Sequence, residues 1–253
     1  MDEADFVAPF AIWRERRAAG DANASLGDLY ELVAEARGRS VEQLTGEERA
    51  QIWALAAPIM EPGFESIPNS DRDEADPIEL VQYDPEWPSQ FEAWRQRLSK
   101  VLRPTPVRID HVGSTAVPGL AAKPVVDIQV SVGDIRDESA YVPSIESIGV
   151  HIRNRDNQHR YFRPPSGRLR EVHVHVCNSG SSWERRHLLF RDYLRNDEEA
   201  RRLYLRVKQE AAQRWANDRI AYTDAKTAVI DELMTKAEVW AQQTQWHIGL
   251  PAQ

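Results

Sequence analysis

Residues 111–128, HVGSTAVPGLAAKPVVDI, decide the fold of this chain. Over 107–112, leading into this stretch, the residues alternate between two faces, and a period of two predicts a β-strand. Gly113 and Ser114 then open a loop of small residues. A Gly-Ser pair at a strand end offers backbone N–H groups and a hydroxyl to an anion, so we expect a phosphate-binding loop here.

The loop leads into a second predicted strand, residues 125–132 (VVDIQVSV). One face of this strand is apolar, and the other carries Asp127 and Gln129. A carboxylate on a strand beside a phosphate-binding Gly-Ser pair can bring Mg²⁺ and a triphosphate together. The Gly-Ser pair, the spacer and the carboxylate therefore predict a site for Mg²⁺ and ATP or another nucleoside triphosphate.

A third predicted strand carries two histidines. Residues 171–176 (EVHVHV) alternate, which places Glu171, His173 and His175 on one face. Side chains at i and i+2 of a strand stand about 6.5–7 Å apart, a spacing that suits metal ligation or substrate contact. A structural role for the pair is the alternative. His111 has two readings as well, as a site residue or as a hydrogen-bonding partner of the loop.

The elements along the chain indicate two modules. Residues 1–62 show helical spacing, with Ser25, Ser40 and Thr45 as predicted helix starts and Trp53, Leu55, Ile59 and Met60 closing a helical cluster. Residues 63–77 are rich in Pro, Ser and acidic residues, which is typical of a linker. Residues 78–245 predict strands first and helices last, an α+β core. Within it we expect a helix over 138–148, strands near 150–153 and 159–163, and helices from 183 to about 243.

The formal net charge of −8 is unevenly distributed. Residues 1–76 carry seventeen acidic and seven basic side chains, whereas residues 77–253 carry twenty-three acidic and twenty-five basic ones. This balance argues against polyanion binding by the first module, and no basic stripe interleaved with aromatics predicts nucleic-acid binding in the second. We expect residues 1–62 to be a packing appendage or a surface for a protein contact or dimerisation.

Two further features bear on the compartment. Uncharged stretches are too short to span a bilayer, and acidic residues occupy the place of a signal peptide's basic region. The single cysteine, Cys177, cannot form an intrachain disulfide and is interpreted as a packing residue. The expectation is a cytoplasmic protein without a membrane partner.

The stretch 111–128 resembles the signature of the GrpB family, also called UPF0157. Similar stretches follow at 173–176 (HVHV), 186–194 (RHLLFRDYL) and 222–226 (YTDAK). The resemblance covers about residues 79–240. It implies a small mixed β-sheet flanked by helices, the fold of the DNA polymerase β-type nucleotidyltransferase superfamily.

In that superfamily one strand ends in Gly-Ser or Gly-Gly, the next carries two carboxylates one residue apart, and a neighbouring strand carries a third. Gly113, Ser114 and Asp127 match this pattern, and Glu171 could supply the third carboxylate. At the second carboxylate position stands Gln129, whose amide cannot supply the negative charge of a ligand that bridges two metals. One Mg²⁺ or a hybrid carboxylate–imidazole site remains open. The candidate metal ligands are Asp127, Gln129, Glu171 and His173.

The resemblance also suggests groups that contact the nucleotide. Lys123 precedes the carboxylate strand and could neutralise a phosphate, and an arginine of 186–194 could hold a triphosphate bidentately. Tyr222 and Lys226 are four residues apart, so one helix face could offer a ring to a base and an ammonium group to a phosphate. The candidate nucleotide and phosphate contacts are Gly113, Ser114, Thr115, Lys123, Arg186, Arg191, Tyr222 and Lys226. The candidate catalytic residues are Asp127, His173 and His175.

These features predict an Mg/NTP-dependent, nucleotidyltransferase-like enzyme that transfers a nucleotidyl group to, or activates, a small-molecule acceptor. One alternative is an ATP-dependent ligase that forms an amide through an acyl adenylate or acyl phosphate. Another is a non-catalytic nucleotide-binding or chaperone-like module. The missing second carboxylate favours the last, and the retained Asp127, His173, His175 and Lys226 favour an enzyme. The sequence does not predict which nucleotide or acceptor is used.

Overall fold

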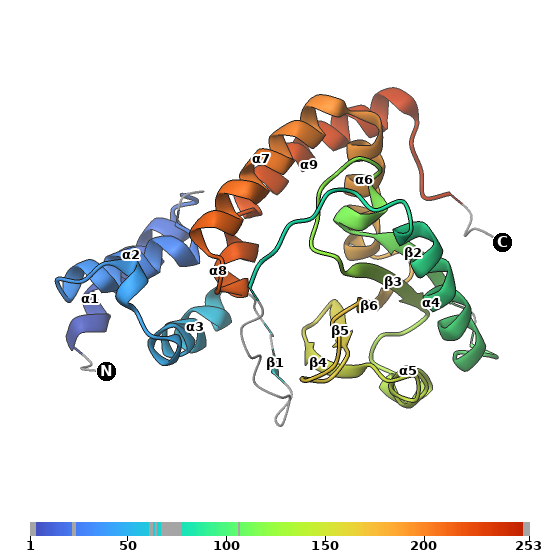
Figure 1. Ribbon diagram of the computed structural model, residues 1–253, viewed down its shortest axis with the longest axis horizontal. Helices are drawn as coiled ribbons and strands as arrows, with labels where there is room; N and C mark the ends of the chain where they lie inside the picture. The colour runs from blue at the N-terminus through green and yellow to red at the C-terminus, as the bar shows by residue number, and fades with distance from the viewer. Residues whose placement is uncertain are drawn as a thin grey trace.

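The computed structural model describes residues 4–21, 24–60, 63, 65–66, 77–105 and 107–249, so most of the predicted linker lies outside the described residues. Helices from both ends of the chain flank a β-sheet (Figure 1). The helices are α1 (Ala4–Ala18), α2 (Leu26–Ala36), α3 (Gly46–Met60), α4 (Trp87–Val101), α5 (Val142–Glu146), α6 (Ser182–Asn196), α7 (Glu198–Arg214), α8 (Arg219–Asp224) and α9 (Thr227–Thr244), with 3₁₀ turns η1 (Val41–Gln43), η2 (Ser114–Ala116) and η3 (Glu138–Ala140).

The sheet has the strand order β1-β4-β5-β6-β3-β2. Strands β3 and β6 run parallel, and the other neighbouring pairs are antiparallel. The predicted fold class, an α+β fold with a small mixed sheet, is confirmed. The strands are β1 (Glu65–Ser66), β2 (Arg108–Val112), β3 (Val126–Val132), β4 (His151–Arg155), β5 (His159–Arg163) and β6 (Val172–Asn178).

Strict alternation along β3 and β6 gives the sheet one apolar and one polar face. Apolar side chains of both strands pack with α4 and α5 in one buried cluster, which includes Trp94, Leu98, Ile128, Ile145, Val174 and Val176. The intervening residues, among them Asp127 and His173, therefore point to the opposite face. The candidate site residues of β3 and β6 therefore lie on this polar face.

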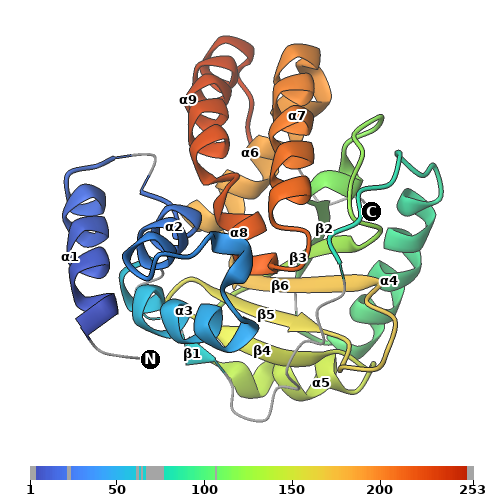
Figure 2. The ribbon, with the colours of Figure 1, turned by 60° about the vertical axis from the view of Figure 1, so that its left-hand side comes forward.

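The C-terminal helices hold the loop that follows β2. Val117 and Leu120 of this loop are buried in a cluster with residues of α6, α7 and α9. In Figure 2, α7 and α9 stand side by side above the sheet. The loop is thereby fixed between the sheet and these helices.

Helices α1–α3 pack on the ends of α7 and α8 (Figure 2). Trp215, which follows α7, lies edge-on to Tyr30 of α2 with ring centroids 5.9 Å apart. Arg49 pairs with Asp218 at 3.1 Å, and Asp224 accepts a hydrogen bond from the backbone N–H at the start of α2. The first module is therefore joined to the core by buried rings and by polar contacts.

The predicted helix starts in the first module are present. Ser25 accepts a hydrogen bond from the N–H of Asp28 at 3.1 Å. Thr45 and Glu48 exchange reciprocal hydrogen bonds of 3.2 and 2.7 Å before α3. Ser40 and Gln43 form a capping box at η1. These local signals fixed the helix boundaries because they depend on neighbouring residues alone.

Some expected elements differ from the structure. The helix expected over 138–148 is divided into η3 and α5, because Pro143 lacks the N–H that a continuous helix needs and sits instead in the first turn of α5. Leu55 and Ile59 were expected to close the helical cluster, but they are 48% and 36% exposed.

Among the residues that the structure describes, each helix is too short or too polar to span a membrane.

The contact between α2 and Trp215 leads to a stability prediction. A Cβ atom at Gly27 would lie 2.6 Å from the Trp215 ring, so Gly27→Ala must displace a buried indole. We expect this overpacking to lower the free energy of unfolding by about 1–3 kcal/mol, although alanine has a higher helix propensity than glycine. Each kcal/mol lost lowers Tm by about 2–4 °C. Gly46→Ala, with nothing within 4 Å of the added methyl, is the matched control. Equal thermal unfolding of the two variants would contradict the packing of α2 on Trp215.

Candidate functional site

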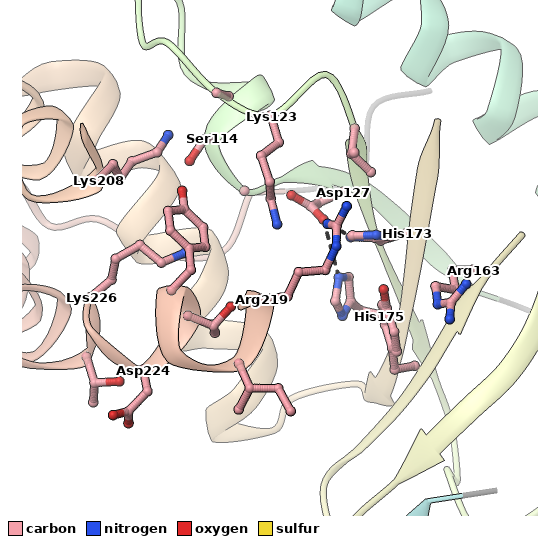
Figure 3. A pocket seen from close by; sticks show the side chains of 18 of the residues that line it. Ser114, Lys123, Asp127, Arg163, His173, His175, Lys208, Arg219, Asp224 and Lys226 are labelled. Carbon is pink, nitrogen blue, oxygen red and sulfur yellow. Dashed lines mark hydrogen bonds and ion pairs between the residues drawn. The ribbon is translucent and has the colours of Figure 1, made fainter. Parts of the chain in front are cut away.

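A cavity of about 780 Å³ opens on the polar face of the sheet. Its walls come from β3, β4, β5 and β6, the loop after β2, and helices α1, α3, α7, α8 and α9. Figure 3 shows Lys208 and Lys226 on the helical side, Asp127 and the two histidines on the sheet side, and Lys123 between them. The volume lies in the range of small-molecule sites. Nine predicted residues line it: Gly113, Ser114, Thr115, Lys123, Asp127, His173, His175, Tyr222 and Lys226.

The Gly-Ser loop lies directly against the carboxylate. Gly113 has φ +70°, and a Cβ atom there would lie 2.3 Å from Oδ2 of Asp127. Only glycine combines this backbone conformation with such a close approach. The register explains the contact, because Val112 at the end of β2 pairs with Asp127 on β3.

Asp127 and the two histidines form a compact group. Asp127 pairs with His173 across the parallel strands, and Gln129 pairs with His175. Nδ1 of His173 lies 3.1 Å, and Nε2 of His175 3.6 Å, from Oδ1 of Asp127. One ligand atom from each residue lies within 4.8 Å of the others, so the group could hold a metal ion.

The electrostatics of this group favour an ionised carboxylate beside a neutral ring. Burial raises the pKa of Asp127, but the two histidines, first of all the hydrogen-bonded His173, outweigh burial and hold that pKa well below its usual range. Burial lowers the pKa of His173 to about 4, despite the nearby carboxylate. At neutral pH Asp127 is therefore ionised beside a neutral His173.

Three lysines gather on the other side of the Gly-Ser loop. Burial and the neighbouring charges of Lys123 and Lys208 lower the pKa of Lys226 well below its usual value. Burial lowers the pKa of Lys123 to about 8 and that of Lys208 to about 7. Lys123 and Lys226 lie over the ring of Tyr222, with Nζ 5.2 and 4.0 Å from its centroid. Among the described residues, neither ammonium group has a carboxylate within ion-pair distance.

Sequence reasoning missed several residues of the cavity. Lys208 is only 2% exposed and donates to the carbonyl oxygen of Ala121 at 2.6 Å. Tyr204, one turn earlier on α7, lines the cavity with Ser114. Their helix is rich in charge, and no local signal distinguishes Lys208 from its solvent-exposed neighbours. Other residues missed include Arg17, Trp53, Met60, Arg153, Tyr161, Arg163, Arg219 and Asp224.

The two arginines predicted for phosphate binding do not line the cavity. Arg186 is exposed and pairs with Asp231 of α9 at 2.6 Å. Arg191 is partly buried near the edge of the sheet, where it binds Asp192 at 2.7 Å and lies 3.7 Å from Asp110. Each guanidinium has a carboxylate partner of its own, so we correct both assignments.

Two predicted metal ligands also lie outside the group. Gln129 is fully buried beyond Asp127 on β3, and neither polar atom of its amide has a hydrogen-bond partner among the residues that the structure describes. Glu171 is exposed and lines a separate recess with Trp94 and Arg97. It precedes β6, so the period-two pattern overestimated the length of that strand. The group at Asp127 therefore offers one carboxylate and two imidazoles.

This donor set does not fit a magnesium ion held by the protein alone, because Mg²⁺ prefers oxygen ligands in octahedral geometry. A magnesium ion that enters with a nucleotide takes most of its ligands from phosphate and water. Mg²⁺ is therefore considered below as part of the nucleotide substrate.

His111 supports the loop from behind. Its Nε2 lies 3.0 Å from Oγ1 of Thr115, and its ring stacks on Phe91 with centroids 4.8 Å apart. The interpretation of His111 as a hydrogen-bonding partner of the loop is confirmed. Thr115 is itself buried, so its hydroxyl is directed to this contact.

A Gly-Ser loop against a carboxylate strand, on the polar face of a small mixed sheet, defines the nucleotidyltransferase-like class of fold that the sequence resemblance implied. The family model described as "GrpB protein" matches residues 77–236. This chain therefore belongs to the GrpB family.

Individual relatives agree with this assignment. A UPF0157 protein of Halalkalibacterium halodurans is 40% identical over 63% of this chain and 82% of its own length, and one of Streptomyces coelicolor is 42% identical over 65% and 86%. A dephospho-CoA kinase of Mycolicibacterium paratuberculosis is 33% identical over 67% of this chain but 48% of its own length. The crystal structure of conserved protein GrpB from Enterococcus faecalis aligns with a TM-score of 0.54 at 30% identity, covering 67% of this chain and all of that one.

The contact between Gly113 and Asp127 can be tested by adding one methyl group. Alanine at a positive φ costs about 1–2 kcal/mol, and at Gly113 it would also displace the carboxylate. We expect Gly113→Ala to lower the free energy of unfolding by about 1–3 kcal/mol more than Gly119→Ala does. Gly119 is the matched control because its φ is +79° and nothing lies within 4 Å of an added Cβ. Urea unfolding measures the stability of both variants. Equal losses of stability would contradict the contact between Gly113 and the carboxylate of Asp127.

The buried His111 predicts a pH dependence of stability. Burial lowers the pKa of His111 to about 4; Asp127 opposes this shift, and Arg191 and Arg195 add to it. Between about pH 6.5 and 4, the unfolded chain binds a proton at this residue that the folded chain does not. His111 therefore destabilises the fold as the pH falls through this window, by up to about 1.4 kcal/mol per pH unit.

Other buried histidines act in the same direction, so the informative quantity is the difference between wild type and His111→Gln. We expect the variant to lose less stability than wild type between pH 7 and pH 5, measured by urea unfolding. Parallel losses in the two proteins would contradict a neutral, buried His111.

Proposed function

We propose that this chain is an NTP-dependent enzyme that transfers a nucleotidyl group to, or activates, a small-molecule acceptor. The cluster of Lys123, Lys208 and Lys226 beside the Gly-Ser loop and Asp127 carries the proposal. In nucleotidyl transfer a nucleophilic atom of the acceptor bonds to the α-phosphorus, and pyrophosphate leaves. The cavity offers cations for the phosphates and a carboxylate for the Mg²⁺ that accompanies them.

The electrostatic cost of the lysine cluster points to a polyanion. Beyond burial, positive charges lower the pKa of both residues: Lys123 and Lys208 act on Lys226, and Arg219 and Arg170 act on Lys123. Among the described Lys, Arg, Asp and Glu side chains that line the cavity, seven are cationic and two, Asp127 and Asp224, are anionic. A triphosphate would offset this repulsion, and Mg²⁺ would link its oxygens to Asp127.

The remaining space suits an acceptor. Trp53 and Met60 of α3 line the cavity together with Tyr161 of β5. These apolar and aromatic walls differ from the lysine cluster, so they fit the part of a substrate that carries little charge. The relative named as a dephospho-CoA kinase extends well beyond the matched part, and we do not propose that activity for this chain.

The ligase alternative is favoured by a separate observation. Arg153 and Arg163 line the same cavity and are 7% and 5% exposed. Figure 3 places Arg163 on the opposite side of Asp127 from Lys208 and Lys226. A guanidinium group suits a carboxylate, the group that a ligase activates as an acyl adenylate or acyl phosphate. Amide formation is therefore the second candidate reaction.

Nucleotide binding to the wild-type chain tests the proposal first. We expect calorimetric titration to detect at least one of ATP, GTP, CTP and UTP, with tighter binding when Mg²⁺ is present. Lys123→Gln should weaken binding about tenfold or more, because it removes a charged partner of the phosphates. Asp127→Asn should remove the magnesium-dependent part of the affinity and abolish turnover.

The matched control is Arg186→Gln, which removes a positive charge outside the cavity and should leave the affinity unchanged. Equal weakening by Lys123→Gln and Arg186→Gln would contradict the cavity as the nucleotide site. Absence of binding for all four nucleotides, with Mg²⁺ and a panel of carboxylates and amines present, would overturn the proposal. Nucleotide retained on an acceptor after pyrophosphate release would indicate nucleotidyl transfer, and an amide product would indicate ligation.

A further inference from the structure

We propose that Asp127, His173 and His175 bind a transition-metal ion of the Mn²⁺ to Zn²⁺ series, and that this ion binds without the nucleotide. The catalytic role of the ion rests on the proposed function, whereas its binding does not. Family resemblance suggests magnesium for this site, whereas its two imidazoles and one carboxylate favour a transition-metal ion. The argument depends on the donor atoms, on the residues behind them and on the access from the cavity.

The three donor atoms already converge. Oδ1 of Asp127 lies 3.1 Å from Nδ1 of His173 and 3.6 Å from Nε2 of His175. All three donor atoms lie within 4.8 Å of one another, as the ligands of a single ion must. The strand register fixes this arrangement, because His173 and His175 occupy successive positions on one face of β6 opposite β3. Small side-chain movements would then suffice to surround an ion.

The residues behind His175 select the tautomer that a metal ligand needs. Nδ1 of His175 lies 2.9 Å from Nε2 of His159, and Nδ1 of His159 lies 3.7 Å from Oδ2 of Asp156. The carboxylate of Asp156 favours a proton on Nδ1 of His159. Nε2 of His159 then carries a lone pair and accepts a hydrogen bond from Nδ1 of His175. Nε2 of His175 is then unprotonated and faces Asp127.

The opposite tautomer is disfavoured for the same reason. If His175 donated from Nε2 to Asp127, then His159 would donate from Nε2 and direct a lone pair at Asp156. A ligating histidine whose second nitrogen is held by a chain of this kind is the usual arrangement around protein-bound metals. His159 is therefore a positioning residue for the metal site.

Packing holds the rings of this chain in place. His159 stacks on Trp183 with centroids 4.8 Å apart, and Tyr161 packs against both His173 and His175 at 5.2 and 5.3 Å. Rotation of either imidazole would therefore disturb a packed aromatic cluster. Rigid ligands of this kind favour an ion whose affinity depends on imidazole rather than on many oxygens.

The donor set identifies the class of ion. Two imidazoles and one carboxylate suit Zn²⁺, Mn²⁺, Fe²⁺, Co²⁺ and Ni²⁺, whereas Mg²⁺ requires oxygen ligands. The three residues line the cavity, so the side away from the strands is open to water or to a phosphate oxygen. Three protein ligands with open positions are typical of a catalytic rather than a structural metal site.

Metal binding by the full-length chain tests this inference. The protein is treated with chelator, dialysed, and titrated with Co²⁺, Zn²⁺, Mn²⁺ and Mg²⁺ without nucleotide. We expect one Co²⁺ per chain, with a visible absorption spectrum, displaced by Zn²⁺ and not by a large excess of Mg²⁺. His175→Ala should lose this spectrum, and His159→Asn should weaken the affinity about 10- to 100-fold.

His151→Asn is the matched control, because His151 lies on β4 outside the cavity with a side chain that is 49% exposed. Circular dichroism identifies any variant that fails to fold, and the competition between Zn²⁺ and Mg²⁺ on wild type needs no variant. Equal affinities for the two ions would overturn the proposal, as would a Co²⁺ spectrum that survives His175→Ala. Metal binding without nucleotide binding would contradict the proposed function alone, and nucleotide binding without Co²⁺ binding would contradict this inference alone.

Discussion

The parallel pairing of β3 with β6 is the constraint on which the site depends. It sets Asp127 opposite His173, and antiparallel pairing of β2 with β3 brings Gly113 onto the same carboxylate. Because side chains alternate along a strand, a shift of one residue would turn these polar groups into the apolar layer under α4 and α5. The burial of Ile128 and Val174 in that layer prevents the shift. Core packing and the chemistry of the site are therefore fixed by the same register.

The lysine cluster destabilises the folded protein. Burial lowers the pKa values of Lys208 and Lys226, and the charge of Lys123 lowers them further. Such lysines raise the energy of the folded state unless a ligand offsets their charge. A cation among Asp127, His173 and His175 and a polyanion among the lysines would stabilise each other as well as the protein. The two proposed ligands are in this sense complementary.

The sequence predicted those parts of the site that depend on local pattern. Gly113, Ser114 and Asp127 follow from a strand, a loop and a strand, and the histidines follow from a period of two. Lys208 could not be predicted, because its place in the cavity depends on how α7 lies over the loop. Arg191 was assigned to phosphate because its contact with Asp110, 81 residues earlier in the chain, depends on packing. Helix orientation and distant ion pairs are properties of packing, which neighbouring residues do not encode.

The first module, residues 1–62, lies outside the region that matches the family but contributes to the cavity. The family match begins at residue 77, yet Arg17, Trp53 and Met60 line the cavity from α1 and α3. The region that matches the family thus supplies the Gly-Ser loop, the carboxylate and the lysines, while Arg17, Trp53 and Met60 add to the cavity wall from outside the match. A contact surface for another protein on residues 1–62 stays a prediction, although Tyr30 of α2 is already buried against Trp215. Under the proposed function, the choice of acceptor would therefore depend on side chains that its relatives need not share.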